Sequence, residues 1–220
     1  MGKLSAVLFD MDGIITNTNP LHFKAWKKMA DEEDLYFDED MNNRLLGISR
    51  ENTLEIILKK NNVLWSDEKK KFWCDKKNRI YRDLLENLSE KDILPGIKNL
   101  LTELNFHEIP CALASSSKNA TIIIKKLGLT EYFSAFADAS KVKNAKPAPD
   151  LFFMAAEKVG AAYENCVGID DSESGIEALK KAGMKAIGIE SSVLLPKADL
   201  KLSSTAELTY EKILELACKE

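Results

Sequence analysis

Acidic side chains occur at two points where a buried strand is expected to end. Asp10 and Asp12 come directly after the first apolar run of the chain, and Asp170 and Asp171 follow a later one. Two acids two residues apart can divide labour, one attacking as a nucleophile and the other moving protons. Two adjacent carboxylates ~4 Å apart repel by about 4 kcal/mol unless a cation or hydrogen-bond donors neutralise them. Each pair also has a structural reading, as an Asp-Gly turn and as a helix N-cap with a first-turn acid.

A serine and a lysine complete a set that suits phosphoryl transfer. Ser115 ends another expected strand, and Lys146 lies in a proline-rich loop rigid enough to hold its ammonium over the acids. Taken alone, these residues are typical of helix capping and of a surface lysine. In the order Asp, Ser, Lys, Asp-Asp, the acids can bind a hard cation such as Mg²⁺, while the hydroxyl and the ammonium balance a transferring phosphoryl group.

The segments that carry these residues alternate between strand-like and helix-like patterns. We expect strands at residues 6–9, 111–114, 136–137, 166–169 and 185–189, and helices at about 96–105, 119–127, 149–159 and 172–182. This alternation predicts an α/β fold with a doubly wound, mostly parallel sheet and helices on both faces, a Rossmann-like core. In such open sheets ligands bind beyond the carboxyl ends of the strands, where the predicted acids stand.

The segment from about residue 18 to residue 92 has a different pattern. It is rich in lysine and glutamate, contains all three tryptophans and has no convincing strand. Apolar residues such as Leu54, Ile57 and Leu58 recur at helical spacing. We therefore predict a catalytic core formed by residues 1–17 and 93–220 and an inserted α-helical cap formed by residues 18–92.

Composition excludes several other classes of protein. The 220 residues are 45% hydrophobic and 30% charged, and no apolar run approaches the roughly 18 residues that cross a membrane. The four cysteines lie far apart in the sequence, so neither a zinc site nor a disulfide framework is expected. Because the chain has only two histidines, any metal ion is expected to bind through oxygen atoms. A net charge of −4 gives no basic surface for nucleic acid. We expect a cytoplasmic monomer with no membrane or nucleic-acid partner.

Four segments resemble the motifs of the haloacid dehalogenase superfamily of phosphotransferases. They are Val-Leu-Phe-Asp-Met-Asp-Gly at residues 7–13, Ser115, Lys146, and Gly-Ile-Asp-Asp at residues 168–171. The resemblance covers essentially the whole chain. It implies that Asp10 is the nucleophile and Asp12 the general acid/base, with Ser115 and Lys146 completing the catalytic set. It also implies that Mg²⁺ is held by Asp10, by the Asp12 carbonyl and by the pair Asp170 and Asp171.

Within that superfamily the chain is most similar to the β-phosphoglucomutases, in segments at residues 12–16, 22–26, 47–51, 113–119 and 145–150. By this resemblance the helical insert is a mobile cap, Thr18 lies near its hinge, and His22 helps to align the acid/base. The resemblance also implies a set of substrate-binding residues: His22, Gly47, Ser49, Arg50, Ser117, Lys118 and Asn119.

The chain departs from these mutases at two positions. Leu46 stands where a basic residue is usual, and Asn17 stands where aspartate is common. The loss of a cation at Leu46 is expected to weaken a contact to the sugar phosphate and to leave more of that role to Arg50.

The activity implied by the resemblance is an isomerisation by phosphoryl transfer. β-Glucose 1-phosphate would become glucose 6-phosphate through an aspartyl-phosphate and a glucose bisphosphate intermediate. A sugar-phosphate phosphatase of the same fold is the main alternative. A phospho-accepting signalling domain would be shorter and would place its acidic pair before the accepting aspartate. An inactive binding homologue would not need every residue of the catalytic set.

Overall fold

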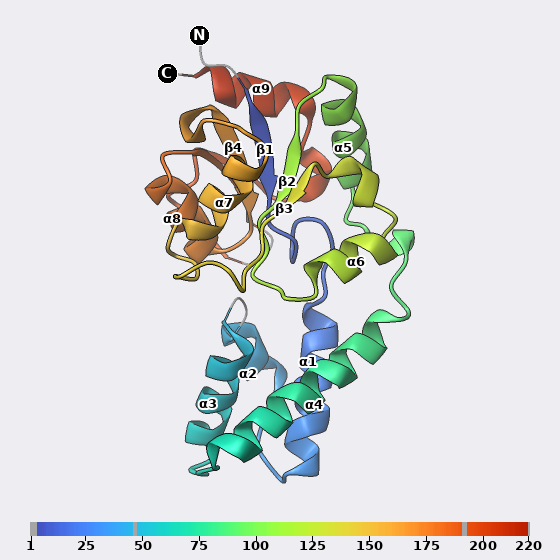
Figure 1. The fold of residues 1–220 in the computed structure, drawn as a ribbon, viewed down its shortest axis with the longest axis vertical. Coiled ribbons are helices and arrows are strands. Elements are labelled where there is room, and N and C mark those ends of the chain that lie inside the picture. Colours follow the sequence, from blue (N-terminus) through green and yellow to red (C-terminus); the bar gives the residue numbers. More distant parts are fainter. Residues whose placement is uncertain (1–3, 46–47, 191–192, 220) are drawn as a thin grey trace. The chain divides into compact units, whose positions relative to one another are not determined.

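A computed structural model of the chain describes residues 4–45, 48–190 and 193–219 (Figure 1). The chain forms two compact units. The first, here called the core unit, comprises Met1–Asn17 and Ser89–Glu220, and the second, the helical unit, comprises Thr18–Leu88. The sequence pattern predicted a cap that ends at residue 92, whereas the helical unit ends at Leu88 and residues 89–92 belong to the core unit.

The core unit is built on a six-stranded sheet in the order β3-β2-β1-β4-β5-β6, with parallel pairing between all neighbours. The strands are β1 (Ala6–Phe9), β2 (Cys111–Leu113), β3 (Ala135–Phe136), β4 (Cys166–Asp170), β5 (Lys185–Ile189) and β6 (Leu200–Leu202). The strand order reverses between β1 and β4. That reversal is the topological switch point at which open α/β sheets bind their ligands.

Helices cover both faces of this sheet. The covering helices are α5 (Ile97–Phe106), α7 (Asp150–Lys158), α8 (Glu173–Lys181) and α9 (Tyr210–Cys218). The unit also contains α6 (Ala120–Lys126) and single 3₁₀ turns at Glu90–Asp92, Thr130–Tyr132, Tyr163–Asn165 and Thr205–Glu207. Helices α7 and α8 pack on one face, and α5 and α9 pack on the other (Figure 1). Because both faces are covered, β1 is a continuous apolar run in which every residue is buried.

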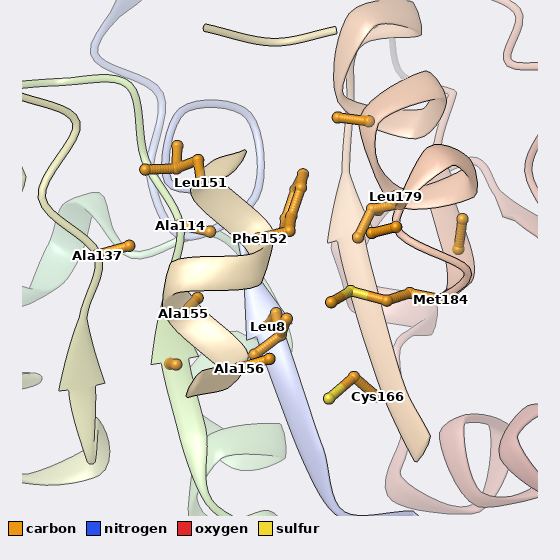
Figure 2. Packing of buried hydrophobic residues seen from close by; sticks show 14 of the residues in the cluster. Leu8, Ala114, Ala137, Leu151, Phe152, Ala155, Ala156, Cys166, Leu179 and Met184 are labelled. Atoms are coloured by element: carbon orange, nitrogen blue, oxygen red, sulfur yellow. The ribbon is translucent and has the colours of Figure 1, made fainter. Parts of the chain in front are cut away.

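The layer beneath α7 and α8 is a contiguous apolar cluster (Figure 2). Phe152 and Ala155 of α7 lie over Leu8 of β1, and Leu179 of α8 packs in the same layer. On the opposite face of β1, the ring of Phe9 meets that of Phe133 edge to face, with the ring centroids 5.9 Å apart. These contacts fix β1 between two packed layers, so its carboxyl end is held rigidly.

The helical unit contains α1 (Asn19–Glu32), α2 (Glu39–Arg44), α3 (Arg50–Lys60) and α4 (Asp67–Leu85). The described residues of this unit form no strand. Side chains of Asp38, Ser49 and Ser66 accept backbone N–H groups at the starts of α2, α3 and α4, as N-cap residues do. Its apolar core includes Trp26 and Trp73. This is a separate core, and each unit buries its own apolar surface.

The two chain segments that join the units are paired on the core side. Thr16 forms an antiparallel bridge with Ile93, and its hydroxyl donates to the Asp92 carbonyl at 2.7 Å. In the helical unit the Tyr81 hydroxyl donates to that of Thr18 at 2.9 Å. Both ends of the connection are therefore fixed by hydrogen bonds within their own unit.

The predicted fold class is confirmed: the sheet is parallel and doubly wound. The strands predicted at residues 6–9 and 185–189 have those bounds, while the one predicted at 136–137 is Ala135–Phe136. Pro149 is the N-cap of α7 and not its first helical residue. Nothing was predicted after residue 189, where β6 and α9 complete the unit. Among the described residues, no helix has the length and hydrophobicity needed to span a membrane.

Candidate active site

Asp10 and Asp170 stand at the carboxyl ends of adjacent strands. Phe9 of β1 is in register with Ile169 of β4, and the Asp10 N–H donates to the Ile169 carbonyl at 2.9 Å. Both carboxyl groups are buried, with 9% of Asp10 and 1% of Asp170 exposed. The pairing of β1 with β4 therefore brings two acids separated by 160 positions to one edge of the sheet, at the switch point.

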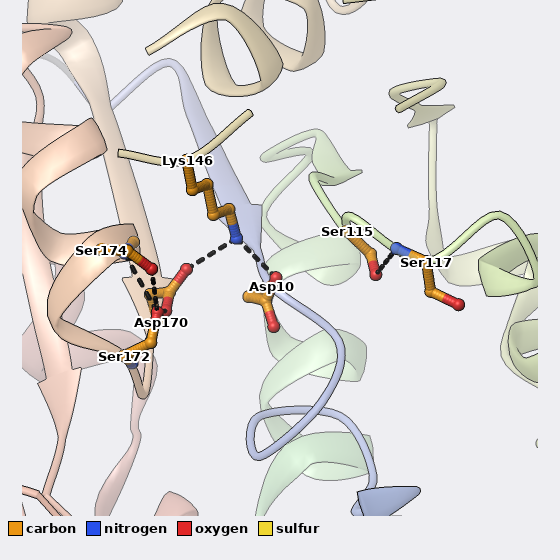
Figure 3. A network of polar contacts seen from close by, with 8 residues as sticks. Asp10, Ser115, Ser117, Lys146, Asp170, Ser172 and Ser174 are labelled. Carbon is orange, nitrogen blue, oxygen red and sulfur yellow. Dashed lines mark hydrogen bonds and ion pairs between the residues drawn. The ribbon is translucent and has the colours of Figure 1, made fainter. Parts of the chain in front are cut away.

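Lys146 joins these two carboxylates (Figure 3). Its Nζ lies 2.6 Å from Asp10 Oδ1 and 2.8 Å from Asp170 Oδ2. The ammonium also lies over the Phe152 ring, 4.8 Å from its centroid. The loop between β3 and α7 thus carries the lysine to the acids, as the proline-rich sequence suggested. Charge-assisted hydrogen bonds of this length are strong and directional, so they fix the nitrogen between the two strands.

Asp170 receives hydrogen bonds on both oxygens. Its Oδ1 accepts from the backbone N–H of Ser172 at 2.9 Å and from the Ser172 hydroxyl at 2.7 Å, while Oδ2 faces Lys146. The Ser172 oxygen in turn accepts the N–H of Gly175 at 3.0 Å. Ser172 therefore caps α8 and orients Asp170 with the same hydroxyl. The N-cap of α8 is thus Ser172, with Glu173 as the acid of its first turn, and not the pair Asp170 and Asp171.

A tight loop after β1 carries Asp12 and lies against the side chain of Asp171. The Gly13 N–H donates to the Thr16 carbonyl at 2.8 Å, and Gly13 has a φ of +78°, which favours glycine. A Cβ at Gly13 would stand 1.8 Å from Oδ2 of Asp171. The Asp171 carboxyl group therefore lies directly against the backbone of the Asp12–Gly13 turn. This turn is both the predicted Asp-Gly turn and part of the site.

The charges of the site perturb its pKa values. Burial raises the pKa of Asp10 to about 7, against the opposing attraction of Lys146. Burial and the nearby Asp10 raise the pKa of Asp171 to about 8. Burial acts to lower the pKa of Lys146, but attraction to Asp10 and Asp170 outweighs it and the pKa is raised. The site thus contains more acid than its lysine neutralises, and an added cation would favour the ionised carboxylates.

The donor set fits a hard divalent cation. The described residues form no cluster of three or more histidine, cysteine, aspartate or glutamate side chains arranged as metal ligands. Mg²⁺ does not require one, because it commonly binds through one or two carboxylates and fills its remaining positions with water and phosphate oxygens. Asp10 and Asp171 supply carboxylate oxygens of that kind, close enough to each other to raise the pKa of Asp171.

Ser115 follows β2, the strand on the other side of β1. Its hydroxyl accepts the Ser117 N–H at 3.1 Å (Figure 3). The Ser117 hydroxyl accepts the Asn119 N–H at 3.2 Å. Ser115 and Asn119 are buried, Ser117 is half-buried and Lys118 is exposed. These residues lead into α6. Their hydroxyl groups accept backbone N–H groups of this segment and also place polar groups near the end of the sheet.

In the helical unit, the half-buried His22 pairs with the buried Lys77. The Lys77 Nζ lies 2.8 Å from His22 Nδ1 and faces the rings of Trp26 and Tyr81, which favours the charged ammonium. Since an ammonium can only donate, Nδ1 is the acceptor and the neutral imidazole carries its proton on Nε2. Burial, then Lys77 and Arg50, hold the pKa of His22 well below its usual value. His22 is therefore a neutral Nε2–H donor.

Lys77 was not among the residues predicted from the sequence. It lies on α4 between Trp73 and Tyr81, four residues from each, and only 3% of it is exposed. A lysine within an apolar stripe at helical spacing is the signal that could have indicated it, because lysine is almost never fully buried without a partner.

The other predicted residues of the helical unit lie at the start of α3. The Ser49 hydroxyl caps this helix by accepting the Asn52 N–H at 3.3 Å, and the Arg50 guanidinium donates to the Cys74 carbonyl at 3.3 Å. Arg50 is thereby held against α4, the helix that carries Lys77. Gly47 and Leu46 lie outside the described residues.

Comparisons with known proteins agree on one group. A family model described as haloacid dehalogenase-like hydrolase matches residues 7–189. The chain is 41% identical over 214 residues to a β-phosphoglucomutase of Bacillus subtilis, covering 96% of this chain and 95% of that protein. It is 31% identical over 217 residues to a phosphorylated carbohydrates phosphatase of Thermotoga maritima, covering 97% and 98%. A crystal structure of β-phosphoglucomutase from Clostridium difficile superposes with a TM-score of 0.92 at 38% identity, covering 97% of each chain.

The raised pKa values predict how stability changes with pH. The folded core binds protons on Asp10 and Asp171 more tightly than the unfolded chain, whose aspartates titrate near 3.8. The contribution of these two carboxyl groups to the stability of the metal-free protein should therefore fall as the pH rises from about 4 to about 8. Mg²⁺ should raise the melting temperature more at pH 8 than at pH 5.5. Calorimetry with KCl at matched ionic strength provides the check, and an equal Mg²⁺ shift at both pH values would contradict it.

Lys77→Met should raise the pKa of His22, because a positive charge 2.8 Å from the imidazole is removed. The nitrogen NMR resonances of the two histidines, assigned with the variant His107→Gln, report both the pKa and the tautomer. Lys76→Met is the control, since Lys76 pairs with Glu32 at the surface. A neutral His22 protonated on Nδ1 in the parent protein, or a pKa unmoved by Lys77→Met, would disprove the pairing.

Proposed function

The chain belongs to the haloacid dehalogenase-like hydrolase family, and on this basis we propose that it interconverts β-glucose 1-phosphate and glucose 6-phosphate. One observation carries the choice of reaction: the 41% identity to a β-phosphoglucomutase extends over nearly the full length of both proteins. The site geometry supports the chemistry, because a buried aspartate at a switch point is held by a lysine that also contacts a second acid.

The roles follow from the positions of the residues. Phospho-Asp10 donates its phosphoryl group to the free hydroxyl of a hexose monophosphate, which gives a bisphosphate. The bisphosphate reverses its orientation and returns its other phosphoryl group to Asp10. Asp12 takes the proton of the attacking hydroxyl and later protonates the leaving oxygen. Lys146 and Ser115 offset the charge on the transferring group.

Mg²⁺ is the proposed cofactor, held by Asp10, the Asp12 carbonyl and the pair Asp170 and Asp171. When bound, it supplies positive charge that orients and neutralises phosphate oxygens. In the described geometry both oxygens of Asp170 are already engaged by Lys146 and Ser172, so Asp171 has the carboxylate better placed to contribute an oxygen.

The helical unit is proposed to act as the cap over the substrate. A closed cap keeps water from phospho-Asp10, and this separates a mutase from a phosphatase. His22 is a neutral Nε2–H donor, suited to hydrogen-bond an acceptor such as the Asp12 carboxylate. Arg50 is a fixed cation suited to a phosphate. The substrate-binding set is completed by Gly47, Ser49, Ser117, Lys118 and Asn119.

A sugar-phosphate phosphatase is the second candidate. The 31% identity to a phosphorylated carbohydrates phosphatase over 97% of the chain favours it, and so does Leu46 at a position usually basic in the mutases. The catalytic set would be the same, and water would replace the hexose hydroxyl as the final acceptor. A monomeric state and a cytoplasmic location stay predictions.

The products distinguish the two candidates. With Mg²⁺, β-glucose 1-phosphate and a trace of the bisphosphate, we expect glucose 6-phosphate to form with little free phosphate. Parallel measurement of both products gives the partition ratio, and Asp10→Asn should lose both activities. Free phosphate in stoichiometric yield without the isomer would assign the chain to the phosphatases.

A further inference from the structure

Gly175 lies inside a helix, where the backbone conformation does not require glycine. It is the third residue of α8, it is buried, and its φ lies outside the left-handed region. Glycine is among the poorest helix formers, and alanine at such a position ordinarily stabilises the helix. The reason for glycine at this position must therefore be steric: a neighbouring group leaves no room for a side chain.

The Asp170 carboxyl group occupies the space that a side chain at position 175 would need. A Cβ at Gly175 would lie 1.9 Å from Asp170 Cγ, 1.9 Å from Oδ2 and 2.1 Å from Oδ1, and these are its three nearest atoms. No carbon can approach a carboxylate so closely. Alanine at this position would require the carboxyl group or the first turn of α8 to move.

The carboxyl group cannot move without cost to the site. Asp170 is 1% exposed, and its oxygens are engaged by Ser172 on one side and by Lys146 on the other. A displaced Asp170 would lose one or both of these partners. Lys146 would then be held by Asp10 alone, and its ammonium would leave the position between the two strands (Figure 3).

We propose that Gly175 is a positioning residue for phosphoryl transfer: its missing side chain lets the first turn of α8 seat the Asp170 carboxylate, which holds Lys146 against Asp10. Gly175 touches no reacting atom and acts through Asp170. This role rests on the proposed phosphoryl-transfer function only for its effect on rate. The steric part concerns the folded protein and can be tested without any activity.

The steric part predicts a change of sign. In the parent protein Gly175→Ala should lower the melting temperature, because the cost of displacing the carboxylate exceeds the gain in helix propensity. In an Asp170→Ala background the three clashing atoms are gone. The same substitution should then raise the melting temperature by about 2–4 °C. Calorimetry of the four full-length proteins measures both shifts.

The steric role of Gly175 can be tested even if one of these variants does not fold. A shift of the same sign and size in both backgrounds overturns it. Failure of both Gly175→Ala proteins to fold also overturns it when Asp170→Ala alone folds, because an atom other than those of Asp170 would then occupy the space. If only the single variant fails to fold and the double variant folds, the clash with Asp170 is confirmed. Glu173→Ala, an exposed change in the same turn, should shift the melting temperature equally in both backgrounds.

The rate provides the second readout. In Gly175→Ala, kcat with β-glucose 1-phosphate should fall by about 100-fold, the scale of a 1 Å misplacement of a catalytic group. KM should change less than threefold, because α8 carries no proposed contact to the hexose. Glu173→Ala should keep kcat within twofold. An unchanged kcat in Gly175→Ala would overturn the positioning role. An inactive parent protein would instead count against the proposed function and leave the melting test intact.

Discussion

The structure of the site depends on one ammonium shared by two buried carboxylates. Lys146 lies between Asp10 and Asp170, within 2.8 Å of both, at the carboxyl ends of β1 and β4. Removing one partner from such a buried cluster leaves an uncompensated charge, at a typical cost of about 3–5 kcal/mol. The cluster is therefore tolerated only if every member is fixed. Several features of the core unit fix the positions of Lys146, Asp10 and Asp170.

The features that fix these three residues come from different parts of the chain. The parallel pairing of β1 with β4 sets the spacing of the two acids, and the apolar layer under α7 keeps β1 in place. The loop before α7 delivers the lysine, whose ammonium lies over Phe152 of that helix. The first turn of α8 supplies the Ser172 hydroxyl and the space at Gly175. The acid excess that remains suits a divalent cation and a phosphate dianion bound together.

Much of this arrangement could be predicted from the sequence, for a specific physical reason. Asp10, Ser115 and Asp170 each follow a buried apolar run, and strand ends in a parallel sheet converge on one edge. Lys146 was identified by its place in a proline-rich loop, but the sequence could not show that it contacts both acids. The resemblance to the haloacid dehalogenase superfamily supplied the roles, and the family match agrees with it.

Other features depend on contacts that no local pattern encodes. Lys77 reaches His22 across 55 positions, and its burial appears only once α1 and α4 pack together. The need for glycine at position 175 becomes visible only when the Asp170 carboxylate is placed. Strand β6 is the short segment Leu-Lys-Leu at the sheet edge, with too little alternation to identify it before its pairing with β5 is known.

The proposed reaction requires Asp10 to accept a phosphoryl group and form a covalent intermediate. Brief incubation of the Mg²⁺-loaded protein with glucose 1,6-bisphosphate, acid quench, borohydride reduction and peptide mass spectrometry would locate the phosphorylated aspartate. Reduction of phospho-Asp10 should convert that residue to homoserine, and the modification should be absent from Asp10→Asn. Modification of a different residue, or turnover with Asp10 never modified, would contradict the account.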